Sequence, residues 1–257
     1  MLNSKPDSHS TAYTPTSPAE RYAQAIESGQ FMPDEAQAQA VQELDRVWKE
    51  LLTRYKASKK AFRRFRRQTY PKGVYMWGGV GRGKTWLMDQ FYESVPFRRK
   101  TRMHFHHFMQ HVHKELNKLS GQRNPLDSVA DQIYKNAVVI CFDEFFVSNV
   151  TDAMIISDLF QKLFERGVTL IATSNIAPEG LYKNGIHRDR FLPTIELVQK
   201  NCTVLNVDAG VDYRLRVLKQ AQLFKHPLSN DAQSWMYERF QALTQTQTLF
   251  NTPIMIN

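Results

Sequence analysis

The residues whose types and spacing point most directly to chemistry stand at positions 78–85, in the run GGVGRGKT. The run fits the pattern G-x-x-x-x-G-K-[ST] and lies between the strand-like GVYMW and the helix-like TWLMDQFYESV. Glycines let backbone N–H groups approach phosphates closely, and the N-terminus of the following helix favours negative charge. The run therefore predicts a phosphate-binding loop rather than a chance Gly-rich turn.

Each part of this loop has an expected task in binding a nucleoside triphosphate. Lys84 supplies positive charge against the β- and γ-phosphates, and the hydroxyl of Thr85 ligates Mg²⁺. The backbone of the loop surrounds the phosphates. The predicted nucleotide-binding residues are Gly78, Gly79, Val80, Gly81, Arg82, Gly83, Lys84, Thr85 and Trp86.

Two adjacent acids, Asp143 and Glu144, follow the apolar run VVICF. In open α/β sheets, ligands bind at the carboxyl ends of the strands. An Asp at that place holds Mg²⁺, usually through water, and a neighbouring Glu can polarise the attacking water as a general base. A simple polar strand terminus is the alternative, and the phosphate loop upstream favours the metal and base roles.

A polar amide stands at the end of another buried strand, where Ser174 and Asn175 follow VTLIAT. If this strand neighbours the one before Glu144, Asn175 can orient the attacking water or touch the γ-phosphate. A turn-forming Asn is the alternative, because Asn is common in turns.

Two arginines, Arg188 and Arg190, follow in the run HRDRFLP. An arginine supplied by a neighbouring subunit can stabilise the charge that develops on a γ-phosphate. We expect at least one of the two to act in this way, which requires a homo-oligomer with the site at the subunit boundary. A surface arginine or an intramolecular ion pair is the alternative.

The elements that must position these residues alternate along the chain. Short apolar strands are expected at 73–77, 137–142, 168–173 and 203–207, and the run 101–108 is expected to be a strand that leads into a helix. Helical patterns start at Ser17 and Pro33 and recur at 126–134, 152–166, 187–200 and 231–243. Strands that alternate with helices and are continuously apolar predict a parallel sheet covered on both faces.

The order of the motifs narrows the class further. The sequence contains no LSGGQ-like signature, which disfavours a transporter ATPase, and no N-K-x-D motif, which disfavours a GTPase. The order of the motifs matches the AAA+ pattern: first the phosphate-binding loop, then the DE pair at 143–144, the SN pair at 174–175 and the R-x-R-F run that starts at Arg188. We therefore predict an α/β AAA+ P-loop NTPase with a five-stranded parallel sheet. The expected parts are a flexible leader (1–17), N-terminal helices and a basic connector (18–72), a nucleotide-binding core (73–210) and the start of a C-terminal helical lid (211–257).

The positive charge of the chain is concentrated in one segment. The 257 residues include 34 Lys or Arg and 25 Asp or Glu, for a net charge of +9. The segment 54–72 holds nine bases and no acid, so the rest of the chain is neutral. The segment is a solvated connector, a contact surface for an acidic partner, or a contact for nucleic acid, which is possible but not favoured.

The cysteines and the hydropathy of the chain bear on the cellular compartment in which the protein is expected. The two cysteines, Cys141 and Cys202, lie in strand-like apolar runs and are expected to be free buried thiols. A reducing compartment fits best. We expect no transmembrane segment and no secretory signal, because no run is long and apolar enough for either.

The runs GGVGRGKTWLMDQFY, HFHHFM, CFDEFFVSNVTDAM, ATSNIAPEGLYKNGIHRDRFLP and VDAGVDYR resemble the ZapE family of bacterial cell-division ATPases and its mitochondrial relatives. The resemblance covers the chain from about residue 19 to its end. It implies Mg²⁺-dependent ATP hydrolysis, a cytoplasmic location with recruitment to midcell, and action on polymers of the tubulin-like protein FtsZ.

The resemblance also places further residues. The family pattern continues past residue 257 and completes the lid, so the lid is expected to be incomplete here. Arg214 and Arg216 are the candidates for the lid arginine that touches nucleotide. The pattern has a Gln that is matched by Gln37, which reads the adenine edge or is an ordinary exposed helix residue.

Five of the eight histidines fall between His104 and His113. His104 and His106 are expected to share a strand face, and His107 and His111 are four residues apart on a helix. Such spacings can bind zinc. Packing or a contact between subunits is favoured, because no Cys is near in sequence and acids are sparse.

Our reading is an ATPase that couples hydrolysis to the remodelling of a protein partner. Two alternatives stay open. One is a nucleic-acid-associated AAA+ loader that uses segment 54–72 on phosphates, and its binding should weaken steeply with salt. The other is a nucleotide-dependent scaffold that binds ATP with little turnover.

Overall fold

The computed structural model describes residues 16–29, 33–58, 70–208 and 234–237. The chain divides into two compact units, residues 1–210 and 211–257. All the elements below belong to the first unit. In the second unit, residues 234–237 are helical. The candidate lid residues Arg214 and Arg216, most of the helix expected at 231–243, most of the leader and most of the basic connector lie outside the described residues.

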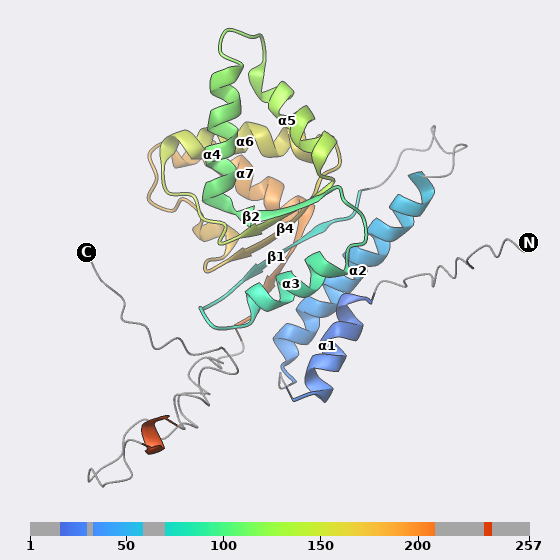
Figure 1. The fold of residues 1–257 in the computed structure, drawn as a ribbon. Coiled ribbons are helices and arrows are strands. Elements are labelled where there is room, and N and C mark those ends of the chain that lie inside the picture. The colour runs from blue at the N-terminus through green and yellow to red at the C-terminus, as the bar shows by residue number, and fades with distance from the viewer. Residues whose placement is uncertain (1–15, 30–32, 59–69, 209–233, 238–257) are drawn as a thin grey trace, which may run out of the picture. The chain divides into compact units, whose positions relative to one another are not determined.

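A five-stranded parallel sheet forms the centre of the first unit (Figure 1). Its order is β2-β3-β4-β1-β5. The strands are β1 (Gly73–Trp77), β2 (Lys100–His104), β3 (Val139–Asp143), β4 (Thr169–Ser174) and β5 (Cys202–Asn206). The predicted parallel sheet of five strands is confirmed.

Helices cover both faces of this sheet (Figure 1). One face carries α1 (Pro18–Glu27), α2 (Glu35–Ser58) and α3 (Lys84–Ser94). The other face carries α4 (Phe105–Lys118), α5 (Pro125–Asn136), α6 (Val150–Glu165) and α7 (Arg188–Asn201). A short 3₁₀ helix, η1 (Pro178–Gly180), precedes α7. None of the described helices is both long enough and apolar enough to cross a lipid bilayer.

The central strands are continuously apolar because they are buried from both sides. Successive side chains of a strand point to opposite faces of its sheet. In β1, Val74 and Met76 accordingly join the apolar cluster with α1–α3, and Tyr75 joins the cluster with α4–α7. Both clusters use residues of β3 and β4 as well, so the strands that carry the candidate site residues are held between two cores.

The start of α1 shows how local sequence sets an element. Ser17 Oγ accepts a hydrogen bond from the Glu20 N–H at 3.1 Å, and the Glu20 carboxylate accepts one from the Ser17 N–H at 2.8 Å. This reciprocal capping box satisfies two of the N–H groups that a helix start leaves without partners. The helix start predicted at Ser17 is confirmed.

The boundary between β2 and α4 differs from the prediction. The strand expected over 101–108 ends at His104, and the helix begins at the next residue. The last residue pair between β2 and β3 is His104 with Asp143, and β3 ends there, so β2 has no partner residues in β3 beyond His104. Phe105, Phe108 and the later apolar residues of α4 instead pack into the core as one helix face. The expectation that His104 and His106 share a strand face is therefore wrong.

Candidate active site

The carboxyl ends of β1, β4 and β3 meet at one edge of the sheet. Trp77 of β1 pairs with Ser174 of β4, and Phe142 of β3 pairs with Ala172 of β4. The phosphate-binding loop follows β1, Asp143 ends β3 and Glu144 follows it, and Asn175 follows β4, the strand between β1 and β3. This edge is where open α/β sheets bind ligands.

The phosphate-binding loop has the conformation that its glycines permit. Gly81 and Gly83 have φ of 79° and 81°, in the left-handed region that side chains disfavour. Gly83 caps α3, and Lys84 is the first residue of that helix. The Lys84 ammonium donates to the carbonyls of Gly78 and Gly79, each at 2.7 Å, and the residue is 8% exposed. Its charge therefore lies inside the curve of the loop.

Two side chains from outside the loop brace it: Gln37 of α2 and Asp208, which follows β5. The amide Nε2 of Gln37, in α2, donates to the Arg82 carbonyl at 3.1 Å. Arg82 Nε pairs with Asp208 Oδ1 at 2.8 Å, and the Gly79 N–H donates to Asp208 Oδ2 at 3.4 Å. Gln37 is 1% exposed, so the interpretation of an ordinary exposed glutamine is wrong. The bracing role of Asp208 was not predicted.

Asp143 is held by an arginine that sequence analysis did not single out. Arg102 Nε and Nη2, in β2, donate to the two carboxylate oxygens of Asp143 at 2.7 and 3.2 Å. Arg102 Nη1 also donates to Asp89 of α3. Burial alone would lower the pKa of Arg102, but the hydrogen bonds to both carboxylates raise it overall, so the guanidinium stays charged. The signal that could have revealed Arg102 is a charged residue inside a strand that lies beside an apolar strand.

Glu144 is presented to solvent by an uncommon backbone conformation. Its φ is 54°, and its side chain is 77% exposed. The Glu144 N–H donates to Thr173 Oγ1 in β4 at 3.2 Å, which helps to hold this conformation. The carboxylate oxygen Oε2 lies 4.0 Å from His104 Nδ1. Non-glycine residues with positive φ concentrate at functional sites.

Glu144 and Asn175 line a common hollow of about 460 Å³. Ser174, His106 and Asp152 also contribute to its wall. The hydroxyl of Ser174 donates to the Phe145 carbonyl at 2.8 Å, which ties the end of β4 to the residues after β3. The arrangement brings a carboxylate and an amide together in a space where water can enter.

The two arginines of the HRDRFLP run occupy different environments at the start of α7. Arg188 is half-buried, and its Nη2 donates to the Glu179 carbonyl at 2.5 Å. Arg190 is exposed. Of the two, Arg190 therefore has the side chain that is better placed to reach a neighbouring molecule.

His113 and the two cysteines have contacts or burial that support the fold. His113 Nε2 lies 2.6 Å from Asp152 Oδ1, which links α4 to the start of α6. Among the described residues, no three or more His, Cys, Asp or Glu side chains gather in a way that could hold a metal ion. Cys141 and Cys202 are free and buried, as expected. Burial raises the pKa of Cys202 to about 12, so its thiol stays protonated.

The residues at this edge fit a magnesium-bound nucleoside triphosphate. The loop surrounds a lysine ammonium, as a phosphate site requires. Thr85 is exposed in the first turn of α3, where its hydroxyl is available to a metal. Asp143 supplies a carboxylate that Arg102 already orients.

The chain is similar over most of its length to known proteins. A family model described as AFG1-like ATPase matches residues 16–257. The cell division protein ZapE of Escherichia coli K12 is 47% identical over 242 residues, which are 90% of this chain and 64% of that protein. Lactation elevated protein 1 homolog B of Danio rerio is 40% identical over 199 residues, 73% of this chain and 40% of that protein. The chain thus spans less than two thirds of these relatives.

Among solved structures, AMPPCP-bound DnaA from Aquifex aeolicus has a similar fold. The TM-score is 0.51 at 14% identity, and the match covers 85% of this chain and 68% of that one. The predicted P-loop fold of AAA+ type is confirmed.

Proposed function

The chain belongs to the AFG1-like ATPase family, and we propose that it binds ATP with Mg²⁺ and hydrolyses it at the edge formed by β1, β4 and β3. The observation that carries the proposal is the Lys84 ammonium inside the phosphate-binding loop. The two acids and the amide leave neighbouring strands at the same edge.

The proposed roles follow from these positions. The loop N–H groups and Lys84 bind the phosphates, and Thr85 and Asp143 hold Mg²⁺. The metal ion would neutralise charge on the phosphate oxygens. Arg102 keeps both oxygens of Asp143 in a fixed orientation.

Glu144 acts in this proposal as the general base. Its exposed carboxylate faces the hollow that Asn175 also lines, so a water held there can lose a proton to Glu144 while the amide orients it. The hydrogen bond from the Glu144 N–H to Thr173 fixes the backbone that presents the carboxylate.

Two substitutions separate binding from turnover. Lys84→Ala should abolish binding of a fluorescent ATP analogue, whereas Glu144→Gln should retain binding and lower the turnover rate by about 100-fold or more, because only the proton acceptor is lost. Lys183→Ala and Glu196→Gln make the same changes at exposed positions and should behave as the parent chain. Hydrolysis by Glu144→Gln at the parent rate would show that the base assignment is wrong.

We further propose that copies of the chain assemble with an arginine of one subunit at the site of the next. Arg190 is the stronger candidate because Arg188 already binds the Glu179 carbonyl. Subunits with Arg190→Ala and subunits with Glu144→Gln should each be inactive alone and regain part of the activity when mixed. Intact assembly with no recovery at any mixing ratio would rule out a shared site.

The partner proposed for this ATPase is FtsZ, in the cytoplasm at midcell. The support is the resemblance in sequence to a cell division protein. Addition of FtsZ polymers should raise the steady-state ATPase rate, and ATP should change the amount of polymer that sediments. Nucleotide binding without turnover, with or without polymers, would instead favour a scaffold.

A further inference from the structure

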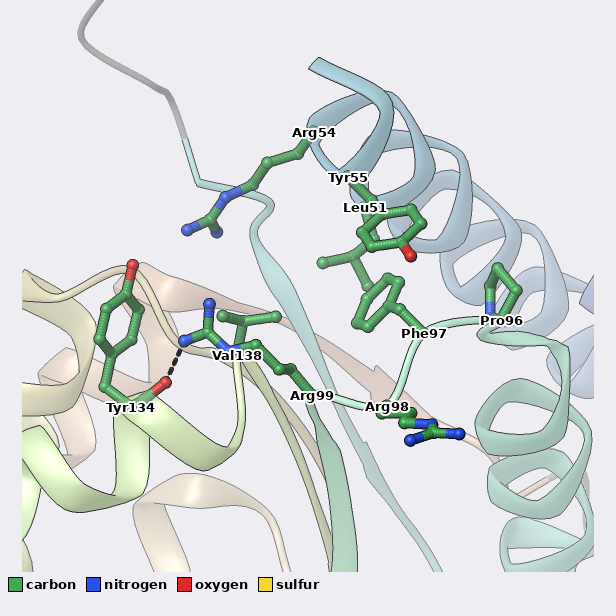
Figure 2. Close-up of a pocket in the computed structure, with 9 residues that line it drawn as sticks. All are labelled: Leu51, Arg54, Tyr55, Pro96, Phe97, Arg98, Arg99, Tyr134 and Val138. Carbon is green, nitrogen blue, oxygen red and sulfur yellow. Dashed lines mark hydrogen bonds between the residues drawn. The ribbon is translucent and has the colours of Figure 1, made fainter. Parts of the chain in front are cut away.

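A second pocket lies at the opposite edge of the sheet, where the strands begin. Its volume is about 520 Å³. Arg99 and Val138, which line it, immediately precede β2 and β3, and Leu51, Arg54 and Tyr55 of α2 form another wall (Figure 2). The candidate active site lies at the carboxyl ends of the strands, so the two sites occupy opposite edges.

The pocket combines apolar walls with converging positive charge. The side chains of Leu51, Tyr55 and Phe97 gather on one side, and Tyr134 of α5 stands on the other (Figure 2). The guanidinium groups of Arg54 and Arg99 extend into the space between these walls (Figure 2). Within the part of the chain that the structure describes, the residues that line the pocket include no carboxylate.

Among the described residues, the hydrogen-bond and ring partners of these two arginines are neutral. Arg54 Nη1 donates to the Gly167 carbonyl at 3.0 Å, and its guanidinium lies 4.3 Å from the centre of the Tyr70 ring. Arg99 Nη2 donates to the Tyr134 carbonyl, and its guanidinium lies 5.0 Å from that ring. Arg54 also has a side-chain hydrogen bond with Tyr134. A guanidinium carries five N–H donors, so these contacts leave donors available on both arginines.

The two charges are also close enough to repel one another. Burial lowers the pKa of Arg54, and the nearby charge of Arg99 lowers it further. Arg54 nevertheless remains protonated, because the ordinary pKa of a guanidinium is far above neutral. An anion between them would relieve the repulsion and accept hydrogen bonds from both.

We infer that this pocket binds an acidic segment of a partner protein, with a carboxylate between Arg54 and Arg99 and a neighbouring apolar side chain against Tyr55 and Phe97. Guanidinium groups bind carboxylates through paired hydrogen bonds. The apolar walls favour a peptide, whose side chains can be charged and apolar in turn, over a phosphate backbone. The inference does not depend on ATP binding or hydrolysis.

The basic segment that begins at this pocket supports an acidic partner. Arg54 is the first residue of segment 54–72, whose nine bases are accompanied by no acid. A concentration of one sign of charge accelerates the approach of an oppositely charged partner. The segment would therefore guide an acidic peptide towards the pocket, and the pocket would select it.

The test uses the full chain and a fluorescein-labelled peptide of sequence Glu-Asp-Phe-Leu-Glu-Asp. Fluorescence anisotropy should show binding, and Arg99→Gln should weaken it at least tenfold because one of the two charges is lost. The double variant that combines Arg54→Gln with Arg99→Gln should weaken peptide binding more than Arg99→Gln alone. Arg123→Gln removes the same charge from an exposed loop and should bind as the parent chain does. The peptide Gln-Asn-Phe-Leu-Gln-Asn should not bind.

Two results would overturn the inference. Equal affinity of the parent chain and both arginine variants would mean that the basic segment alone holds the peptide. Tighter binding of an oligothymidylate that is lost in Arg99→Gln would make the pocket a nucleic-acid site. Thermal unfolding checks that each variant is folded. If Arg99→Gln does not fold, Arg99→Lys replaces it and should bind more weakly than the parent, because an ammonium cannot bind a carboxylate bidentately.

Discussion

At the scale of single residues, Arg102 has the most consequential contacts near the candidate active site. Its guanidinium joins Asp143 of β3 to Asp89 of α3. The side chains of Arg102 and Asp143 are 19% and 13% exposed, so their charges are largely removed from water. The carboxylate that we propose as a metal ligand is therefore oriented by the protein before any metal binds.

Removal of this guanidinium should destabilise the fold measurably. Arg102→Ala leaves two neighbouring carboxylates without a counter-charge, and we expect the free energy of unfolding to fall by about 2 kcal/mol, less than for a fully buried pair. Arg102→Lys should recover only part of the loss, because an ammonium cannot bind both oxygens of Asp143 in the same way. Denaturant unfolding measures both, with Arg123→Ala as the exposed control.

At the scale of elements, the start of α6 depends on one side chain. Asn149 Oδ1 accepts a hydrogen bond from the Asp152 N–H at 2.8 Å, and Asn149 Nδ2 donates to the Asp152 carboxylate at 2.7 Å. The cap fixes where the helix begins after the loop that carries Glu144. The same Asp152 contacts His113 of α4, so this cap also supports the packing of two helices.

Asn149→Ala should lower the free energy of unfolding by about 1 kcal/mol, the usual cost of losing a helix N-cap. The exposed neighbour Thr151 provides the comparison, since Thr151→Ala lies in the same helix but removes no cap. Chemical denaturation of both variants measures the difference. Equal stability of the two would mean that the Asn149 side chain does not hold the helix start.

Local patterns were sufficient for much of the fold and for the main site residues. The apolar strands, the glycine loop and the acids at the end of β3 were predictable because each has a signature within a few residues. The roles of Arg102 and Asp208 were not, because each depends on which strand lies beside which. Gln37 looked like a surface residue because its burial comes from packing against the loop, not from its neighbours in sequence.

At the scale of the whole molecule, the sheet joins two apolar clusters into one structure. Leu44 of α2 is 1% exposed and lies in the cluster with α1 and α3, which shares β1, β3 and β4 with the other cluster. The N-terminal helices are thus part of the same cooperative unit as the strands that carry the site.

Leu44→Ala should accordingly lower the free energy of unfolding by about 2–5 kcal/mol, because it leaves a cavity in that cluster. Leu192→Ala makes the same substitution on α7 at a position that is 42% exposed, and should have little effect. Circular dichroism and tryptophan fluorescence should report a single transition in both variants. A separate early transition for the N-terminal helices would contradict the view of one cooperative unit.

The position of Asp208 links the nucleotide loop to the rest of the chain. Asp208 pairs with Arg82, and the first unit ends at Gly210, two residues later. The Asp208 carboxylate contacts Arg82 and the Gly79 N–H, so it anchors the last described residue of the first unit to the nucleotide loop. Loss of this one side chain would therefore loosen both the loop that binds phosphate and the segment that follows β5.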